Sequence, residues 1–323
     1  MKILILAGGF ATRLWPLTEK RAKPLLLLDG KTILAHILDK IPKEDGNLET
    51  ILLTNKKFAG DFENELAKLG RRDVKIFCED AHSDNEKVGA LGAVSLAINE
   101  FKINDNILIL AGDNLLPDLK IEQLFCENDS AKLAVREVKD FYEARKFGVV
   151  EVGPDSEYGF EVVDFEEKPE EPKSKLVSTG FCAIGKDLFP FLHEFAQKNP
   201  DALGAIFADL LNNGKSVFAE KVTGHWFDVG SFETYLEAHK MLQGEDLKLG
   251  KKVVQDGNKF SGKVSIGDGC EVKNCRILNS IVYPGCKLEN CRISETIIDE
   301  NCDFTGVDLN RKLVRKRTRL YNF

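Results

Sequence analysis

The sequence lacks several patterns that would place it in common classes of protein. Its apolar runs are all too short to cross a bilayer, so no membrane-spanning helix is expected. None of its eight cysteines forms a CxxC pair, which favours reduced thiols over disulfides. The N-terminus goes straight into a strand, so we expect no signal peptide. These absences together predict a cytoplasmic protein without membrane contact.

The length and charge of the chain suggest more than one domain. At 323 residues the chain is long for a single domain, and two unequal domains are expected. The net charge is −7, but residues 311–323 hold six Lys and Arg and no acid, which leaves −13 for the rest. This basic tail could contact an acidic neighbour, a phosphate or nucleic acid. A solvated or subunit-docking tail is our preferred interpretation, because the acidic remainder disfavours a nucleic-acid-binding protein.

The stretch from Lys2 to Leu28 carries the strongest signal, although it contains neither common phosphate-binding motif. GxxxxGK[ST] and GxGxxG are both missing. Instead, an apolar run reaches Ala7 and breaks at Gly8-Gly9, where glycine lets the backbone approach a phosphate closely. Arg13 and Lys23 follow in a loop stiffened by two prolines. The pattern predicts a strand followed by a cationic loop that grips phosphates.

Strands and helices alternate in the next part of the sequence. Helices are predicted over 32–41 and 58–69, and strands over 50–54 and 73–78. Such a βαβ series implies a mostly parallel sheet with helices on both faces. A ligand should then sit at the carboxyl ends of the strands, where Gly8 lies.

A further apolar strand, from Ile107, delivers an acid to its carboxyl end. It reads ILILAGDN and places Asp113 directly after the strand. Mg²⁺ takes oxygen ligands, usually one or two carboxylates together with substrate phosphates. Asp113 is therefore a candidate magnesium ligand, although an Asp in this position is often only a turn residue.

The segment GGFATRLWPLTEKRAKP resembles the signature of the sugar-1-phosphate nucleotidyltransferases, usually GGxGTRLxPLTxxxxKP. One position departs, because Ala11 stands where the family usually has glycine, which leaves the tightness of the phosphate turn open. The resemblance implies a Rossmann-like, mostly parallel but mixed sheet. It covers residues 1–243, the expected catalytic domain.

For the nucleotide, the resemblance implies contacts from one group of residues. They are Ala7, Gly8, Gly9, Thr12, Arg13, Lys23, Glu79 and Gly89. A carboxylate only accepts hydrogen bonds, so Glu79 could receive the ring N–H of uracil, thymine or guanine, whereas adenine has none on that edge. The alternative for Glu79 is a solvated loop acid.

For the sugar phosphate, the resemblance points to segments of the β-rich sequence that starts at Ala131. The implied residues are Gly148, Glu167, Lys168, Thr179 with Gly180, and Trp226. Asp228, in the segment WFDVG, would complete the Mg²⁺ site with Asp113. A cap before a helix at 232–243 is the alternative for Asp228, but Ser231 is better placed for that. The implied catalytic group is Arg13, Lys23, Asp113, Lys168 and Asp228.

A repeat of sixteen residues occupies 265–310, within a second domain expected over 250–310. Apolar positions coincide in successive copies, as do Cys270, Cys286 and Cys302, and also Cys275 and Cys291. This pattern is typical of a β-solenoid and resembles a left-handed β-helix of about two and a half coils. The cysteines are interpreted as small buried hydrophobes. A metal site is the alternative, but no histidine or CxxC supports it.

Left-handed β-helices often carry acyltransferase activity that uses a histidine base. All five histidines of this chain precede the repeat. We therefore expect the β-helix to serve oligomerisation or regulation, with a homo-oligomer as the expected assembly.

The resemblance implies that a nucleoside triphosphate and a sugar 1-phosphate give an NDP-sugar and pyrophosphate. Glucose 1-phosphate with dTTP or UTP is favoured, because the EEKP and WxDxG segments resemble most those of the thymidylyltransferase branch of the family. Mannose 1-phosphate with GTP competes with it. A non-catalytic subunit that binds NDP-sugar is a further alternative, disfavoured because Arg13, Lys23, Asp113, Lys168 and Asp228 are all intact.

Overall fold

The computed structural model describes residues 1–9, 12–43, 48–80 and 88–322. It separates into two compact units that interleave along the sequence. The first comprises Met1–Phe10 and Leu34–Asp228, and the second comprises Ala11–Ile33 and Val229–Phe323. The loop after the first strand therefore groups with the C-terminal part of the chain. The departure from the family signature at Ala11 lies outside the described residues.

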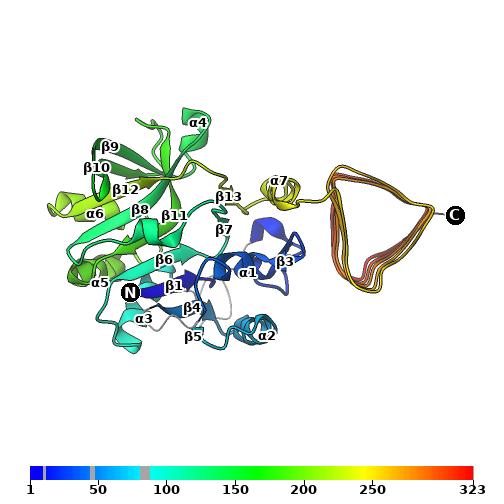
Figure 1. The fold of residues 1–323 in the computed structure, drawn as a ribbon, viewed down its shortest axis with the longest axis horizontal. Coiled ribbons are helices and arrows are strands. Elements are labelled where there is room, and N and C mark those ends of the chain that lie inside the picture. The colour runs from blue at the N-terminus through cyan, green and yellow to red at the C-terminus, as the bar shows by residue number, and fades with distance from the viewer. Residues whose placement is uncertain (10–11, 44–47, 81–87, 323) are drawn as a thin grey trace. The chain divides into compact units, whose positions relative to one another are not determined.

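A nine-stranded mixed sheet forms the middle of the first unit, in the order β5-β4-β1-β6-β11-β8-β12-β10-β9 (Figure 1). The strands are β1 Lys2–Leu6, β4 Glu49–Asn55, β5 Lys75–Glu79, β6 Ile107–Ala111, β8 Ser130–Glu137, β9 Gly148–Ser156, β10 Gly159–Glu167, β11 Leu176–Ile184 and β12 Ser216–Lys221. Strands β5, β4, β1 and β6 are mutually parallel, whereas β11 is antiparallel to both β6 and β8. This confirms the Rossmann-like mixed sheet expected from the sequence.

Helices cover both faces of this sheet because its central strands are apolar throughout. Leu4 belongs to a core cluster with residues of α3, α5 and α6. Its neighbours Ile3 and Ile5 are equally buried, and the period of two turns them to the opposite face. The helices of this unit are α2 Ala59–Leu69, α3 Ala90–Glu100, α4 Phe141–Ala144, α5 Phe189–Lys198 and α6 Ile206–Asn212; α1, Ile33–Leu38, begins at the boundary of the two units.

The second unit begins with the cationic loop. It contains two 3₁₀-helices, Thr12–Leu14 and Lys23–Leu25, and the antiparallel pair β2 (Leu27–Leu28) and β3 (Lys31–Thr32). Helix α7, Phe232–Leu242, is capped by Ser231, whose side chain accepts a hydrogen bond from the Thr234 amide in a capping box. The expectation that Ser231 caps this helix is confirmed.

The C-terminal part of the second unit is a β-helix with a triangular cross-section (Figure 1). Three parallel sheets have the orders β14-β17-β20-β23-β26, β15-β18-β21-β24-β27 and β16-β19-β22-β25. The strands are β14 Leu247–Leu249, β15 Val254–Asp256, β16 Lys259–Ser261, β17 Val264–Ile266, β18 Glu271–Lys273, β19 Arg276–Leu278, β20 Ile281–Val282, β21 Lys287–Glu289, β22 Arg292–Ser294, β23 Ile297–Ile298, β24 Asp303–Thr305, β25 Asp308–Asn310, β26 Leu313–Val314 and β27 Arg319–Tyr321.

The predicted period of sixteen is confirmed, but the β-helix is longer than the sequence suggested. Successive partners are sixteen residues apart from the second coil onward, as in Glu271 and Lys287, and seventeen apart between the first two coils. Four coils and part of a fifth are present, and the basic segment 311–323 contributes β26 and β27. The outer coils carry a weaker sequence signal, because the position that aligns with the buried Val272 is the polar, exposed Gln255 in the first coil, and the one that aligns with the buried Phe304 is the partly exposed Leu320 in the last.

The repeated cysteines fill two columns of the β-helix core. All five are buried and free. The thiols of Cys270, Cys286 and Cys302 donate to backbone oxygens in the coil above, each at 3.2 Å. This uniform packing fits the interpretation of these cysteines as small buried hydrophobes.

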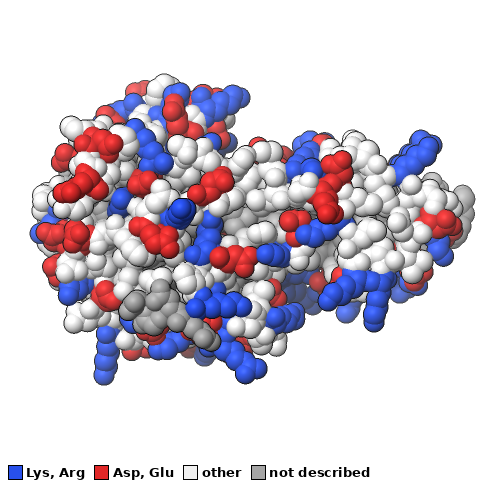
Figure 2. Space-filling model, in the orientation of Figure 1, with Lys and Arg blue, Asp and Glu red and all other residues white. Residues whose placement is uncertain are grey.

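No helix in the described part of the chain is long and apolar enough to cross a membrane. On the face shown in Figure 2, acidic and basic side chains are interspersed over the first unit. That visible face therefore lacks the single-sign stripe typical of a nucleic-acid-binding surface.

Candidate active site

The carboxyl ends of four parallel strands bring the nucleotide and metal candidates of the first unit to one edge of the sheet. Leu6 at the end of β1 pairs with Ala111 at the end of β6. The amide of Gly112 donates to the Leu6 carbonyl at 2.9 Å, which fixes the turn that leads to Asp113 beside the turn at Gly8. On the other side of β1, Asn55 ends β4 next to Glu79 at the end of β5. Gly8, Glu79 and Asp113 therefore lie at the carboxyl ends of the parallel strands, which is the edge predicted from the sequence.

Glu79 faces the glycine turn from β5. The sequence predicted strand 73–78 with Glu79 just beyond it, but Glu79 is the last residue of the strand and is buried. Its Oε2 accepts the Val88 amide at 3.0 Å. A Cβ on Gly8 would stand 3.1 Å from Oε1. The carboxylate thus lies between Gly8 and Val88 rather than in solvent.

Asn55 is a site residue that the sequence analysis missed. It is fully buried, and its Nδ2 donates to the Gly8 carbonyl at 2.8 Å. Its Oδ1 has no hydrogen-bond partner among the described residues. A buried acceptor without a donor is costly, so Oδ1 offers a hydrogen-bonding position beside the glycine turn.

Only glycine fits at position 89, because of its backbone conformation and its close contact with Pro200. Its φ of +92° is a conformation that L side chains rarely adopt, and an added Cβ would stand 2.6 Å from the backbone of Pro200. The Pro200 carbonyl accepts the amides of Leu91 and Gly92 at the start of α3. Gly89 therefore allows the α5–α6 connection to close the N-terminus of α3.

The two predicted metal ligands come together on a short antiparallel ribbon. Strand β7, Asn114–Leu115, pairs with β13, Phe227–Asp228, and Asp228 lies opposite Asn114. Asp113 directly precedes Asn114, so the two acids are one position apart across the ribbon. The Asn114 side chain donates to Asp113 Oδ1 at 2.9 Å and accepts from Trp226 Nε1 at 2.7 Å. The ribbon thus orients Asp113 through Asn114.

The two acids fit a magnesium site better than a site for a softer metal. They supply oxygen atoms only, and Mg²⁺ is usually held by one or two carboxylates plus substrate phosphates. No group of three or more His, Cys, Asp or Glu side chains suited to a metal occurs within residues 1–9, 12–43, 48–80 and 88–322. A site built from protein ligands alone is therefore not indicated in that part of the chain.

Two of the predicted sugar residues, Gly148 and Glu167, lie on the paired strands β9 and β10. Gly148 pairs directly with Glu167, and a Cβ on Gly148 would lie 3.0 Å from Glu167 Oε2 and 2.3 Å from Phe165 Cζ. Gly204 approaches the same carboxylate oxygen. The side chain of Lys168, at a φ of +48°, reaches Glu167 Oε1 at 3.4 Å. Two glycines thus make room for Glu167.

Thr179 and Gly180 form an irregularity in β11. Ser178 pairs with Val135 and Cys182 with Leu133, so β11 has two extra residues here. Thr179 is buried, and its hydroxyl donates to the Ala134 carbonyl at 3.1 Å. Gly180 has a φ of +83°, and a Cβ there would stand 3.0 Å from Ala111 and 3.7 Å from Asn114. The irregular strand therefore packs against the end of β6.

Trp226 is part of a side-chain wall. Its ring lies 5.0 Å from that of Phe147, tilted by 59°. Both rings pack on a small buried cluster of four aliphatic residues, which are Val138, Ala144, Val149 and Val177. Because Phe147 precedes Gly148, the wall adjoins the strands that carry Glu167.

Thr12, Arg13 and Lys23 belong to the second unit. Thr12 and Arg13 are exposed in the first 3₁₀-helix, whereas Lys23 begins the next one and is only 8% exposed. Residues on both sides of Lys23 bond to the C-terminal part of this unit. The Leu27 amide donates to the hydroxyl of Tyr283, and the hydroxyl of Tyr235 donates to the Leu27 carbonyl at 2.6 Å.

Arg21 makes the second connection between the loop and the β-helix. Its guanidinium bonds Asp299 at 3.3 Å, pairs with Glu300 and lies over the Tyr283 ring at 4.8 Å from the centroid. Burial raises the pKa of the Asp299 carboxyl, and the charge of Arg21 opposes that shift. The loop that carries Lys23 is thereby held at both ends by α7 and the β-helix.

A model of the family described as nucleotidyl transferase matches residues 2–245. The chain belongs to this family. The resemblance inferred from the segment that begins at Gly8 is thereby confirmed.

Individual members of the nucleotidyl transferase family show how far the similarity extends. The bifunctional protein GlmU of Methanocaldococcus jannaschii is 29% identical over 271 residues, which are 83% of this chain and 61% of that protein. The UTP–glucose-1-phosphate uridylyltransferase AglF of Haloferax volcanii is 31% identical over 253 residues, 76% of this chain and 98% of AglF. The chain thus spans about three fifths of GlmU, whereas nearly all of AglF matches about three quarters of this chain.

A solved structure supports the fold. It is a Bacillus anthracis protein in complex with sucrose, named as a candidate glucose-1-phosphate thymidylyltransferase. The TM-score is 0.64 at 24% identity, and the match covers 76% of this chain and 96% of that one. The fold of this nucleotidyl transferase therefore matches that of a solved structure.

Proposed function

We propose that the chain is a sugar-1-phosphate nucleotidyltransferase that converts a nucleoside triphosphate and a sugar 1-phosphate to an NDP-sugar and pyrophosphate. The observation that carries the proposal is the β7–β13 ribbon, where Asp113 and Asp228 stand one position apart at the edge that also holds Gly8 and Glu79. Two neighbouring carboxylates beside a glycine turn suit a magnesium–triphosphate group.

The residues would act by positioning and charge neutralisation, because a sugar phosphate oxygen is already a competent nucleophile for the α-phosphorus. Arg13 would neutralise the leaving pyrophosphate, Lys23 the nucleotide phosphates and Lys168 the attacking phosphate. Asp113 and Asp228 would hold Mg²⁺, which supplies electrostatic stabilisation of the phosphate oxygens when bound.

The remaining contacts divide between the two substrates. Ala7, Gly8, Gly9, Thr12 and Gly89 would provide the turn and loop around the nucleotide, with Glu79 reading the base edge. Gly148, Glu167, Thr179 and Trp226 would surround the sugar. The proximity of Gly148 to Glu167 and the packing of Trp226 against Phe147, next to Gly148, support the sugar group.

Glucose 1-phosphate with dTTP or UTP is the proposed substrate pair. A carboxylate at Glu79 can only accept a hydrogen bond, which supports a base with a ring N–H, and the name of the AglF relative includes UTP and glucose 1-phosphate. Mannose 1-phosphate with GTP satisfies the same base chemistry and is the competing pair. A cytoplasmic homo-oligomer assembled through the β-helix is the proposed state of the protein.

A screen of pyrophosphate release tests the function directly. ATP, CTP, GTP, UTP and dTTP are each combined with glucose, galactose, mannose and N-acetylglucosamine 1-phosphates in the presence of Mg²⁺. We expect turnover with UTP or dTTP and glucose 1-phosphate, and its loss in Asp113→Ala with an unchanged circular dichroism spectrum. Binding of NDP-sugar without turnover in any combination would instead identify a regulatory subunit, and normal turnover in Asp113→Ala would contradict the metal assignment.

A further inference from the structure

Two faces of the β-helix differ in how charges are stacked on successive coils. On the sheet β15-β18-β21-β24-β27, one outward row reads Val254, Glu271, Lys287, Asp303 and Arg319. The signs alternate from Glu271 onward, and Lys287 bonds Glu271 at 2.9 Å. Opposite charges placed directly across neighbouring strands stabilise a sheet. The charges of this row therefore neutralise one another.

The sheet β16-β19-β22-β25 has no such alternation of charge over its first three strands. Its equivalent row reads Lys259, Arg276, Arg292 and Asp308, each paired in register with the next. Three cations thus stand directly opposite one another at the strand spacing of about 4.8 Å. Like charges in such positions are destabilising. The row therefore carries a cost that nothing within the sheet removes, except at its Asp308 end.

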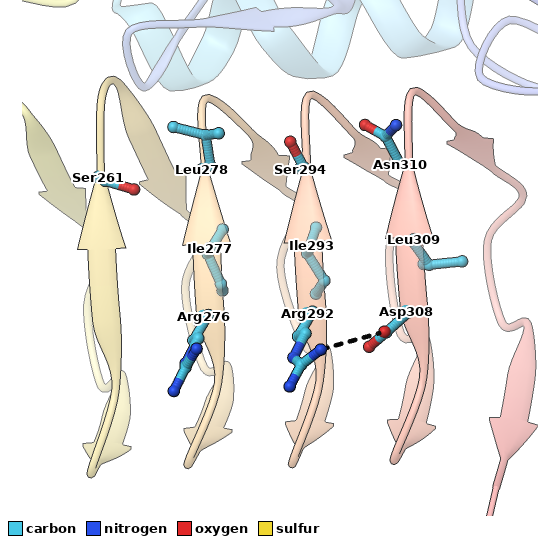
Figure 3. Close-up of a pocket in the computed structure, with 10 residues that line it drawn as sticks. All are labelled: Ser261, Arg276, Ile277, Leu278, Arg292, Ile293, Ser294, Asp308, Leu309 and Asn310. Atoms are coloured by element: carbon cyan, nitrogen blue, oxygen red, sulfur yellow. Dashed lines mark ion pairs between the residues drawn. The ribbon is translucent and has the colours of Figure 1, made fainter.

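The cations of this row are poorly neutralised. Arg276 makes no ion pair with any residue of the described chain, and the dashed line in Figure 3 joins Arg292 to Asp308. Arg292 meets Asp308 only at 3.8 Å, with both side chains about 70% exposed. An ion pair this long and this exposed contributes little. The guanidinium groups of Arg276 and Arg292 therefore remain available to an external anion.

A groove of about 320 Å³ lies along the same strands. Figure 3 shows Arg276, Arg292 and Asp308 in one row of its lining, below a second row. The second row is Ser261, Leu278, Ser294 and Asn310, which offers hydroxyl and amide groups around an apolar residue. The volume is at the lower end of the range for small-molecule sites.

We propose that this groove binds a small phosphorylated molecule, with its phosphate between Arg276 and Arg292 and its uncharged part along the row of Leu278. Neighbouring guanidinium forks match the geometry of phosphate oxygens. The Asp308 carboxylate ends the positive run after three positions, which disfavours a long polyanion. The site lies wholly within the β-helix and is independent of the proposed activity.

Titration calorimetry on the full chain tests the proposal, with inorganic phosphate and glucose 6-phosphate as probes and a single-stranded oligodeoxynucleotide as a long anion. The test variant is Arg276→Gln/Arg292→Gln. The matched control, Lys287→Gln/Arg319→Gln, removes the same charge from the alternating face. We expect a binding component for glucose 6-phosphate that is weakened at least tenfold in the test variant and kept in the control. Phosphate bound at the proposed active site would be unchanged in both.

Three results would overturn the proposal. They are identical isotherms for all three proteins, an equal loss in both double variants, or binding of the oligonucleotide alone. Thermal unfolding without phosphate gives a second readout. Arg276→Gln should leave the melting temperature unchanged or raise it, because a like-charge contact is removed, whereas Lys287→Gln should lower it. A decrease with Arg276→Gln equal to that with Lys287→Gln would mean that Arg276 has a structural role instead.

Discussion

Asn114 donates a hydrogen bond of 2.9 Å from its side-chain amide to the carboxylate of Asp113. The same side chain accepts the indole N–H of Trp226 at 2.7 Å, so its amide orientation is fixed from the other side. Asn114 also pairs with Asp228 across the β7–β13 ribbon. One residue thus connects both proposed metal ligands, and groups in this position typically orient the ligands of a metal.

We predict that Asn114→Leu, which keeps the volume but removes both hydrogen bonds, raises the Mg²⁺ concentration for half-maximal pyrophosphate release about 10–100-fold. Trp226→Phe removes only the outer hydrogen bond and keeps a ring against Phe147, so a smaller shift is expected. Magnesium titrations of initial rate, with circular dichroism to check the fold, measure both effects. An unchanged magnesium requirement in Asn114→Leu would show that Asn114 only joins the two strands.

Gly148 is predicted to be intolerant of a side chain. A Cβ there would stand 2.3 Å from Phe165 Cζ and 3.0 Å from Glu167 Oε2, so Gly148→Ala must displace the residue proposed to bind the sugar. We expect a loss of about 1–3 kcal/mol in the free energy of unfolding. We also expect the KM for the sugar 1-phosphate to rise over its wild-type value by more than the KM for the nucleotide does. Denaturant unfolding and steady-state kinetics measure these quantities.

Gly60→Ala is the control for that prediction. Gly60 lies in α2, has no atom within 4 Å of an added Cβ, and does not have a positive φ. The substitution should be neutral or stabilise the protein by about 0.4–1 kcal/mol, since alanine favours the helix. Equal losses in both variants would mean that the crowding at Gly148 relaxes without consequence.

The sequence was most informative where a local pattern determines the structure. The run from Ile3 to Ala7 is uniformly apolar because β1 is buried on both faces, and its end at Gly8 located the site edge. The period of sixteen predicted the β-helix because each coil buries the same positions. The roles of the proposed sugar residues were available only from the family resemblance, and they remain predictions.

What the sequence could not show depends on pairing between distant segments. Asn55 became a site residue only because β4 lies beside β1, and Arg21 meets Asp299 across 278 residues of chain. Asn55 stands in no motif, and Arg21 occupies a variable position of the signature that begins at Gly8. The like-charged row on the β-helix was equally hidden, because its members are recognised as neighbours only once the coils are in register.

Arg21 is predicted to stabilise the second unit strongly. Asp299 is 2% exposed, so Arg21→Met would leave a buried carboxylate without its cationic partner. We expect a loss of about 3–5 kcal/mol in the free energy of unfolding, as is typical when one partner of a buried ion pair is removed. Adding Asp299→Asn should recover part of that loss because the buried charge is gone. A double-mutant cycle by chemical denaturation measures the coupling, and strictly additive losses would refute it.

His239 is predicted to make stability depend on pH. The imidazole is fully buried on α7, its Nε2 lies 3.3 Å from the Lys263 carbonyl, and Nδ1 has no hydrogen-bond partner among the described residues. Burial lowers the pKa of His239 from 6.5 to about 4, although its bond to the Lys263 carbonyl opposes the shift. The unfolded chain therefore binds the proton more readily than the folded chain between these values.

The His239 contribution should be complete above pH 6.5 and fall progressively as the pH drops toward 4, by on the order of 3 kcal/mol in total. His239→Leu removes the titrating group, so its unfolding free energy should fall less steeply over this interval, even though the variant loses the bond to Lys263. Urea unfolding of both proteins at several pH values between 4 and 7 measures the two slopes. His36→Leu controls for loss of a histidine in general. Parallel profiles for wild type and His239→Leu would show that another group governs the acid response.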